Sequence, residues 1–282
     1  MNPFKRSRTA ATAPIVTLPD DARVRVGHYL DASLSPGSEL RRGRSIRDGY
    51  ARGWGLQFGK LREQVAADPL YQEAMQRVGG RSLMAEDNRK NLFLILCAYL
   101  TRLPKGHIIE YGSYRGGNAL FMALVAKHVL PGVRVYALDT FAGMPATNGE
   151  VDAHRAGDFA DVDLDELRGY AESLGLDNLV FVKGRFEETA LPTLRDAGSL
   201  TLAHIDCDIY SAVAYAYDAS LPYLVPGGYI VFDDANVSSC LGATEAVEEL
   251  VIRRDGRFSE QAFPQYVFRN LPVSDSTGAT AR

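Results

Sequence analysis

Short apolar runs alternate with longer segments of helical character over most of the 282-residue chain. Five runs are typical of buried strands: Ile108–Ile109, Val133–Leu138, Leu179–Lys183, Leu200–Ile205 and Tyr229–Phe232. Three intervening segments are typical of helices: Ala119–Val129, Leu164–Leu174 and Tyr210–Leu224. Strands and helices that alternate in this way predict an α/β domain, with a mostly parallel sheet covered by helices on both faces.

A helical pattern also precedes the first strand. Five apolar residues fall on one face of a helix that we expect over residues 91–103: Leu92, Ile95, Leu96, Tyr99 and Leu100. Pro104-Lys105-Gly106 ends this helix. We therefore expect four parts: a disordered arm (1–22), an N-terminal helical extension (23–104), the α/β domain (105–270) and a disordered tail (271–282).

The turn after the first strand has a distinctive sequence, HIIEYGSYRGGN, over residues 107–118. Glu110, Gly112 and Gly116 give the spacing Glu-x-Gly-x-x-x-Gly, and such glycines let a backbone approach a ligand closely at a helix N-terminus. Asp139 follows the next apolar run, where an acid can accept hydrogen bonds from ribose hydroxyls. The combination resembles the S-adenosylmethionine site of class I methyltransferases. The alternative is a turn whose glycines only pack strand against helix.

Four aspartates follow two other predicted strands. Asp206 and Asp208 come after the fourth strand, and Asp233 and Asp234 come after the fifth. Adjacent strands lie about 4.8 Å apart, and ligands of open α/β sheets bind outside the carboxyl ends of the strands. We therefore expect these four carboxylates to converge beside the cofactor turn.

Carboxylates gathered in a cleft repel one another unless they are protonated, paired or bound to a cation. Neither acidic segment contains Lys or Arg, and an all-oxygen ligand set predicts a hard divalent ion. Mg²⁺ is the first choice, with Ca²⁺ or Mn²⁺ as alternatives. The competing interpretation is that some of the acids cap helices, especially Asp208, which lies just before a predicted helix.

Four segments sharpen the resemblance when they are taken in order: GSYRGG, LDTFAGMP, HIDCDIY and VPGGYIVFDDAN. From about residue 89 to residue 249 the chain resembles the macrocin-type sugar O-methyltransferases, the TylF/MycF family. That resemblance implies a Rossmann-like class I methyltransferase fold, for which we expect seven strands, and methyl transfer from S-adenosylmethionine to a sugar hydroxyl with Mg²⁺. It also implies metal ligands at Asp206, Asp233 and Asp234, and a general base at Asp208. We expect cofactor contacts at Glu110, Tyr111, Gly112, Ser113, Gly116, Asn118, Asp139, Thr140 and Phe186.

Two other functions stay open at this point. A cation-dependent catechol or phenol O-methyltransferase has a similar set of acids at the same strand ends. Asp234, where such an enzyme has asparagine, and Asp208 as an available base favour the less acidic sugar hydroxyl. A non-catalytic nucleoside-binding protein is the third possibility, and the presence of both a cofactor turn and four convergent acids argues against it.

Composition and charge indicate which kinds of molecule the protein binds. The formal net charge of −4 provides no field that would gather a nucleic acid. Apolar runs fall short of the ~18 residues of a membrane span, so we expect a cytoplasmic protein that acts on a small-molecule sugar or glycoside. We also expect a homo-oligomer. Three cysteines lack the spacing of a metal site or a disulfide framework and are interpreted as structural thiols: Cys97, Cys207 and Cys240.

A long polar stretch, residues 146–161, follows the second strand and is interpreted either as a lid or as a disordered loop. His154 within it is interpreted as a solvent-exposed surface residue, and His204 within the fourth strand as a packed one. A basic cluster is interpreted as solvated surface, with a phosphate-bearing substrate or a neighbouring subunit as the alternatives: Arg41, Arg42, Arg44 and Arg47.

Overall fold

The computed structural model describes residues 40–41, 44–45, 59–261 and 264–271. The chain divides into two units, Met1–Ala51 and Arg52–Arg282. In the first unit, strands β1 (Leu40–Arg41) and β2 (Arg44–Ser45) pair antiparallel. The predicted arm and the tail beyond Leu271 lie outside the described residues, as do two arginines of the basic cluster, Arg42 and Arg47.

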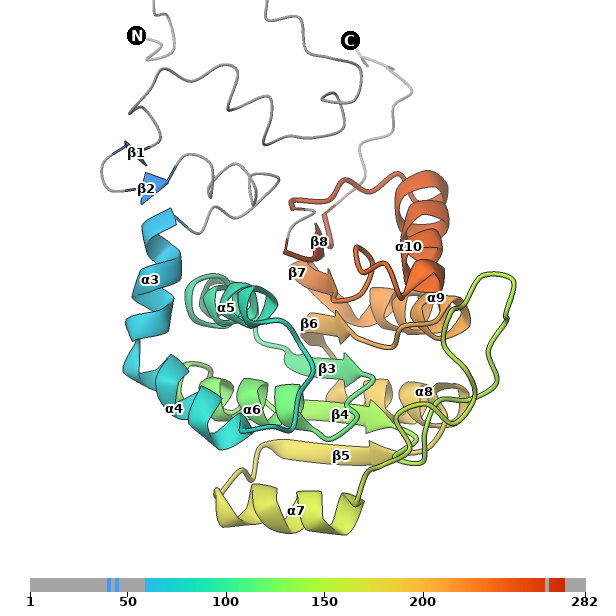
Figure 1. Ribbon diagram of the computed structural model, residues 1–282. Helices are drawn as coiled ribbons and strands as arrows, with labels where there is room; N and C mark the ends of the chain where they lie inside the picture. Colours follow the sequence, from blue (N-terminus) through green and yellow to red (C-terminus); the bar gives the residue numbers. More distant parts are fainter. Residues whose placement is uncertain (1–39, 42–43, 46–58, 262–263, 272–282) are drawn as a thin grey trace, which may run out of the picture. The chain divides into compact units, whose positions relative to one another are not determined.

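The second unit contains a six-stranded sheet in the order β5-β4-β3-β6-β7-β8 (Figure 1). Its strands are β3 (His107–Tyr111), β4 (Val135–Asp139), β5 (Leu179–Lys183), β6 (Leu200–Ile205), β7 (Leu224–Phe232) and β8 (Tyr266–Arg269). Strands β3 to β7 are parallel, and β8 pairs antiparallel with β7 at the edge. The mostly parallel sheet is confirmed, with six strands among the described residues in place of the seven expected.

Helices cover both faces of this sheet (Figure 1). On one side lie α3 (Gly59–Ala67), α4 (Pro69–Val78), α5 (Glu86–Leu94), the π-helical η2 (Ile95–Tyr99), the 3₁₀ turn η3 (Leu100–Arg102), α6 (Gly117–Val129) and α7 (Leu164–Ser173). On the other lie α8 (Phe186–Ala197), α9 (Tyr210–Ser220), the 3₁₀ turn η4 (Leu221–Tyr223), α10 (Leu241–Ala246) and the π-helical η5 (Val247–Arg254). The expected coverage of both faces is confirmed.

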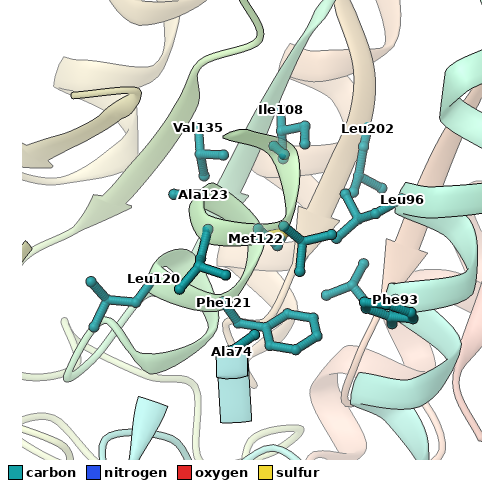
Figure 2. Packing of buried hydrophobic residues seen from close by; sticks show 14 of the residues in the cluster. Ala74, Phe93, Leu96, Ile108, Leu120, Phe121, Met122, Ala123, Val135 and Leu202 are labelled. Atoms are coloured by element: carbon teal, nitrogen blue, oxygen red, sulfur yellow. The ribbon is translucent and has the colours of Figure 1, made fainter. Parts of the chain in front are cut away.

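Strand side chains alternate between the two cores, as the pleat of a strand requires. Ile108 and Leu202 belong to the hydrophobic cluster under α6, whereas Ile109 and Ala203 belong to the cluster under α8 and α9. Figure 2 shows the first cluster, in which strand residues meet side chains of α4, α5, η2 and α6: Ile108, Val135, Leu202, Ala74, Phe93, Leu96, Leu120, Phe121, Met122 and Ala123. The helices before the sheet therefore share one core with the α/β domain.

Several element ends differ from the sequence-based expectation. The helix expected over residues 210–224 ends at Ser220, and β7 begins at Leu224. Leu224 pairs with Leu200 before a shift of register, so Pro226-Gly227-Gly228 lie within the strand, at a bulge. Near the end of the described residues, Gln261 forms an isolated antiparallel bridge with Val267 of β8.

None of the helices in the described ranges combines the length and the apolar content that a bilayer-spanning segment needs.

Candidate active site

The order of the strands places a crevice between β3 and β6. From β3 the chain builds the sheet outward through β4 to β5 and then returns to β6 on the other side of β3. Ligands of open α/β sheets bind at such a switch point, outside the carboxyl ends of the strands. A cleft of about 470 Å³ lies there, lined by the ends of four strands, the segment between α4 and α5, and the loop between β4 and α7.

The turn after β3 is organised around Glu110, which is fully buried. Its carboxylate accepts hydrogen bonds from Ser113 Oγ (2.8 Å) and Asn118 Nδ2 (2.7 Å), and these bonds tie the turn to the start of α6. Gly112 has a φ of +87°, and a Cβ there would lie 1.7 Å from the carbonyl oxygen of Asp206. This glycine is therefore required for packing, besides lining the cleft.

The nine residues expected to contact the cofactor divide into two groups. Six line the cleft: Gly112, Ser113, Asn118, Asp139, Thr140 and Phe186. Three lie behind its surface. These are Glu110, Tyr111 and Gly116. Tyr111 is fully buried, and its hydroxyl accepts a hydrogen bond from Ser220 Oγ (2.9 Å). Gly116 packs against Leu167. These three shape the turn from beneath.

Asp139, at the end of β4, is held between two turns. Its Oδ2 accepts a hydrogen bond from Tyr114 N (2.8 Å) and its Oδ1 one from Phe141 N (2.7 Å). Burial raises the pKa of the Asp139 carboxyl above its ordinary value, and these backbone hydrogen bonds oppose that rise. The carboxylate is thus fixed in the cleft wall, where its remaining acceptor capacity can serve a ligand.

Asn118 gives a direct test of whether a cofactor fits. Its Oδ1 is buried, and within the described part of the chain it has no hydrogen-bond partner. Because Asn118 lines the cleft, that oxygen can accept a hydrogen bond from a ligand's ammonium group. With the Asp139 carboxylate, the polar groups fit the amino-acid and ribose parts of S-adenosylmethionine.

Three aspartates meet at the carboxyl ends of β6 and β7. One carboxylate oxygen from each of Asp206, Asp233 and Asp234 lies within 4.8 Å of the others. Burial raises the pKa of all three carboxyls; for Asp206 and Asp234 the neighbouring carboxylates raise it further, well above the ordinary value. Of the four carboxylates expected to converge, these three meet, and Asp208 lines the same cleft without joining the cluster.

Two amides orient Asp233. Asn88 Nδ2 of α5 and Gln265 Nε2, just before β8, each donate a 2.8 Å hydrogen bond to Asp233 Oδ1. Both donors are buried. Such outer contacts fix the direction of a carboxylate in metal sites.

The three-aspartate cluster fits a hard divalent cation. Oxygen ligands on opposite sides of an octahedral Mg²⁺ are about 4.1 Å apart, so a set within 4.8 Å is close to the required span. The cluster contains only oxygen donors, and a cation would relieve the repulsion that raises these pKa values.

Asp208 adopts a left-handed backbone conformation, with a φ of +60°. Strand β6 has already ended at Ile205, so Asp208 does not continue the alternation of Asp206 along a strand. Four non-glycine residues in the described ranges have positive φ, and three of them line the cleft: Tyr114, Phe159 and Asp208. Backbone strain of this kind concentrates at functional sites. Burial raises the pKa of the Asp208 carboxyl, whereas the hydrogen bond from Cys240 and the charge of His154 lower it.

The interpretation of Asp208 as a helix cap is wrong. The side-chain acceptor at the start of α9 is Asp152, whose Oδ1 accepts a 2.9 Å hydrogen bond from Tyr210 N. Asp152 lies in the loop between β4 and α7, and its Oδ2 also accepts from Asn148 N (2.9 Å). The Asp208 carboxylate is therefore not used in capping and faces the cleft.

The interpretation of His154 as a solvent-exposed surface residue is also wrong. Its side chain is only 18% exposed and lines the cleft, with Nε2 3.7 Å from Asp208 Oδ1. The loop folds back on itself through hydrogen bonds from Met144 N to Asp158 O and from Gly157 N to Met144 O, which carry His154 to the site. His204, by contrast, is packed as expected, fully buried in β6.

Sequence reasoning missed several cleft residues. Residues 81–85, between α4 and α5, and Asn88 line the cleft on the side of the helical extension. Asn91 is a polar, buried residue within the helix expected over residues 91–103 and could have indicated that this helix contacts polar groups. Asn88 is also buried, but it lies in the polar run of residues 86–91, which gives no such signal. Cys240 gave no comparable signal.

The sequence model of the macrocin O-methyltransferases (TylF) matches residues 84–252, more than half of the chain. The chain belongs to this family.

Named relatives match the chain in part. Over 150 residues it is 32% identical to the 8-demethyl-8-(2,3-dimethoxy-alpha-L-rhamnosyl)-tetracenomycin-C 4'-O-methyltransferase of Streptomyces olivaceus, covering 49% of this chain and 56% of that protein. Over 156 residues it is 28% identical to the mycinamicin III 3''-O-methyltransferase of Micromonospora griseorubida, covering 51% and 59%. The chain thus spans little more than half the length of these relatives.

Solved structures agree on the fold. The O-methyltransferase NovP superposes with a TM-score of 0.59 at 21% identity, over 69% of this chain and 84% of that one. CalS11, a calicheamicin methyltransferase, gives 0.56 at 20% identity, over 74% and 90%. At these identities the likeness shows the class I methyltransferase fold alone.

Proposed function

We propose that this protein transfers a methyl group from S-adenosylmethionine to a hydroxyl of a sugar or glycosylated acceptor, with the help of Mg²⁺. The observation that carries the proposal is the meeting of Asp206, Asp233, Asp234 and Asp208 in one cleft beside the cofactor turn. Membership of the macrocin O-methyltransferase family supports it. The named relatives act on sugar-bearing natural products, which supports a glycoside acceptor here.

The cofactor side of the cleft supplies binding and orientation. S-adenosylmethionine, when bound, supplies an electrophilic methyl group. Asp139 offers an acceptor for ribose hydroxyls, and Asn118 Oδ1 one for the ammonium group. Phe186 adds an aromatic surface, which is held edge-on by the buried ring of Tyr111 at a centroid distance of 5.1 Å.

The acidic side of the cleft supplies the groups that activate the acceptor. Mg²⁺, when bound, polarises a hydroxyl and stabilises its negative charge. Asp206, Asp233 and Asp234 would hold the ion, and Asn88 and Gln265 keep one of these ligands in place. Two vicinal hydroxyls of a sugar could reach the ion together, and this would orient one of them.

Asp208 is the proposed general base. As the acceptor oxygen bonds to the methyl carbon and the sulfur–methyl bond breaks, the hydroxyl proton passes to the Asp208 carboxylate. A positioned base of this kind contributes roughly 10²–10⁴-fold to a rate. Its raised pKa, caused by burial, makes it a stronger proton acceptor than an exposed aspartate.

Methyl transfer by the purified full-length chain tests the proposal. S-adenosylmethionine is offered with a panel of glycosides and catechols, with Mg²⁺ or with EDTA, and products are identified by mass. We expect methylated glycosides only when Mg²⁺ is present. If only catechols were methylated, the protein would be a phenol or catechol O-methyltransferase instead. If full turnover remained after extensive EDTA treatment, the proposed role of the metal would be wrong.

A further inference from the structure

A second group of potential metal ligands lies beside the three-aspartate cluster. Cys240 Sγ is 3.3 Å from Asp208 Oδ1 and 3.7 Å from His154 Nε2, and His154 Nε2 is 3.7 Å from Asp208 Oδ1. The three residues come from the loop after β4, the segment after β6 and the start of α10, and all three line the cleft. Three separate segments of the chain thus bring nitrogen, oxygen and sulfur donors to one point.

The spacing of these donors matches a tetrahedral zinc site. Zinc bonds of about 2.3 Å to sulfur and about 2.0–2.2 Å to nitrogen and oxygen place the ligand atoms about 3.4–3.6 Å apart. The observed separations of 3.3, 3.7 and 3.7 Å differ from those edges by about 0.3 Å or less. One ion can therefore reach all three donors without a backbone movement.

The histidine is already oriented as a ligand. His154 Nδ1 lies 3.3 Å from Asp158 Oδ2, and Arg155 N donates a 2.9 Å hydrogen bond to the same oxygen. The tautomer of His154 that carries its proton on Nδ1 donates that proton to Asp158 Oδ2. The lone pair of Nε2 is then directed toward Asp208 and Cys240, as in the carboxylate–histidine–zinc arrangement.

We propose that His154, Asp208 and Cys240 form a zinc site, distinct from the three-aspartate cluster and sharing the cleft with it. The two donor sets select different ions, because nitrogen and sulfur suit Zn²⁺ whereas three carboxylates suit Mg²⁺. Binding replaces the thiol proton with the metal and releases that proton to solvent. The three protein ligands would leave a fourth zinc position, which a water or an acceptor hydroxyl could occupy.

Zinc at this site has a consequence that rests on the proposed function. Asp208 would be a zinc ligand, and the positive charge of the ion would make its carboxylate a much weaker acceptor of the substrate's proton. Zn²⁺ is therefore expected to inhibit methyl transfer even when Mg²⁺ saturates the three-aspartate cluster. The site would thus reduce the enzyme's activity in response to Zn²⁺.

Cobalt substitution tests the site independently of any activity. Co²⁺ is added to the metal-free full-length protein in excess Mg²⁺, and the absorption spectrum is recorded. We expect a thiolate-to-cobalt charge-transfer band and the intense visible bands of tetrahedral Co²⁺, both removed by added Zn²⁺. Cys240→Ser should lose the thiolate band, whereas Cys207→Ser, a matched change in the same cleft, should keep it. Asp158→Asn should weaken Co²⁺ binding by roughly 10-fold or more.

Several outcomes would overturn the proposal. One is a wild-type spectrum without a thiolate band; another is a band lost in Cys207→Ser but kept in Cys240→Ser. Thermal unfolding in EDTA checks that each variant is folded. Asp206→Asn should keep the thiolate band, because Asp206 belongs to the three-aspartate cluster and not to the proposed zinc site.

Inhibition is measured as the ratio of each variant's rates with and without Zn²⁺, in excess Mg²⁺. Zinc should suppress the wild type about 10-fold or more and Cys240→Ser far less. A cobalt band together with zinc-insensitive methyl transfer would overturn the inhibitory role. Absence of methyl transfer under every condition would count against the proposed function and leave the cobalt result standing.

Discussion

Asn88 Nδ2 donates a 2.8 Å hydrogen bond to Asp233 Oδ1, and this bond joins helix α5 to the carboxyl end of β7. The two residues are 145 positions apart in the chain. The helices before the sheet therefore do more than cover its face, because one of them orients a carboxylate of the three-aspartate cluster.

Asn88→Leu should raise the Mg²⁺ concentration needed for half-maximal methyl transfer by roughly 10-fold, because loss of an outer contact typically weakens a metal site by 10–100-fold. Mg²⁺ titration of the rate gives the value. Asn178→Leu is the matched control, since Asn178 also donates a side-chain bond, to the Ala123 carbonyl, away from the cleft. An unchanged Mg²⁺ requirement in Asn88→Leu would show that Asp233 does not need this donor.

The two aspartates after β6 should fail in different ways when each is changed to asparagine. Asp206→Asn removes a charge from the metal ligands, so the rate should fall and recover in part at high Mg²⁺. Asp208→Asn removes the proton acceptor, so the rate should fall by roughly 10²–10⁴-fold at every Mg²⁺ concentration. The rate of methyl transfer, measured over a range of Mg²⁺ concentrations for both variants, distinguishes the two roles. Rescue of Asp208→Asn by Mg²⁺ would make Asp208 a ligand of that ion.

Asp139→Ala should weaken S-adenosylmethionine binding by roughly 10-fold, the equivalent of about 1.4 kcal/mol, because the cofactor loses an acceptor in the cleft wall. The backbone donors Tyr114 N and Phe141 N also lose their partner, so the two turns should loosen. Isothermal calorimetry measures the affinity, with Asp177→Ala, a change in an exposed ion pair, as control. Equal affinities would place the ribose contact elsewhere.

Stabilisation of the fold by Mg²⁺ should increase with pH. Burial raises the pKa of Asp206 well above its ordinary value of 3.8, with further rises from Asp233 and Asp234. A carboxyl with a raised pKa in the folded state contributes stability that is fully present below 3.8 and is lost as pH rises through the raised value. Mg²⁺ competes with those protons, so the rise in Tm on adding Mg²⁺ should be larger at about pH 7.5 than at about pH 5.5. Asp206→Asn should flatten this dependence, whereas an effect equal at both pH values would contradict it.

Asp152→Ala should free the loop of residues 146–161 from the start of α9. Loss of a side-chain cap typically costs about 0.5–2 kcal/mol, and the loop should also exchange amide hydrogens faster. Hydrogen exchange by mass spectrometry measures this, with Glu150→Ala, an exposed residue of the same loop, as control. The wild-type loop should become more protected when cofactor and acceptor are bound together, as a lid would. The same exchange in both states would make the loop a plain connection.

The parts of the fold that the sequence predicted are those determined by local pattern. The strands β5 and β6 begin and end where the apolar runs do. For β6 the reason is burial on both faces, as expected for a central parallel strand, whereas β5 lies at the edge of the sheet and is half-buried. The meeting of Asp206 with Asp233 and Asp234 was also predictable, because β6 and β7 are neighbours and their ends coincide.

What could not be predicted depends on the path of loops and on contacts far apart in sequence. His154 reaches Asp208 only because the loop folds back through Met144, and periodicity carries no record of that path. Asp152 caps a helix 58 residues later, whereas local capping rules favoured Asp208. The homo-oligomer, the cytoplasmic location and the division of the chain into four parts stay predictions.

The bond from Gln265 to Asp233 indicates the order in which the three-aspartate cluster is completed during synthesis. Gln265 follows Asp233 by 32 residues, so a nascent chain that has just added Asp233 still lacks one of the two amides that orient its carboxylate. The other, Asn88, has long since left the ribosome. The cluster therefore reaches its final geometry only after the segment leading into β8 has emerged and docked, so tight binding of the proposed cation would have to wait until translation of this domain is nearly finished.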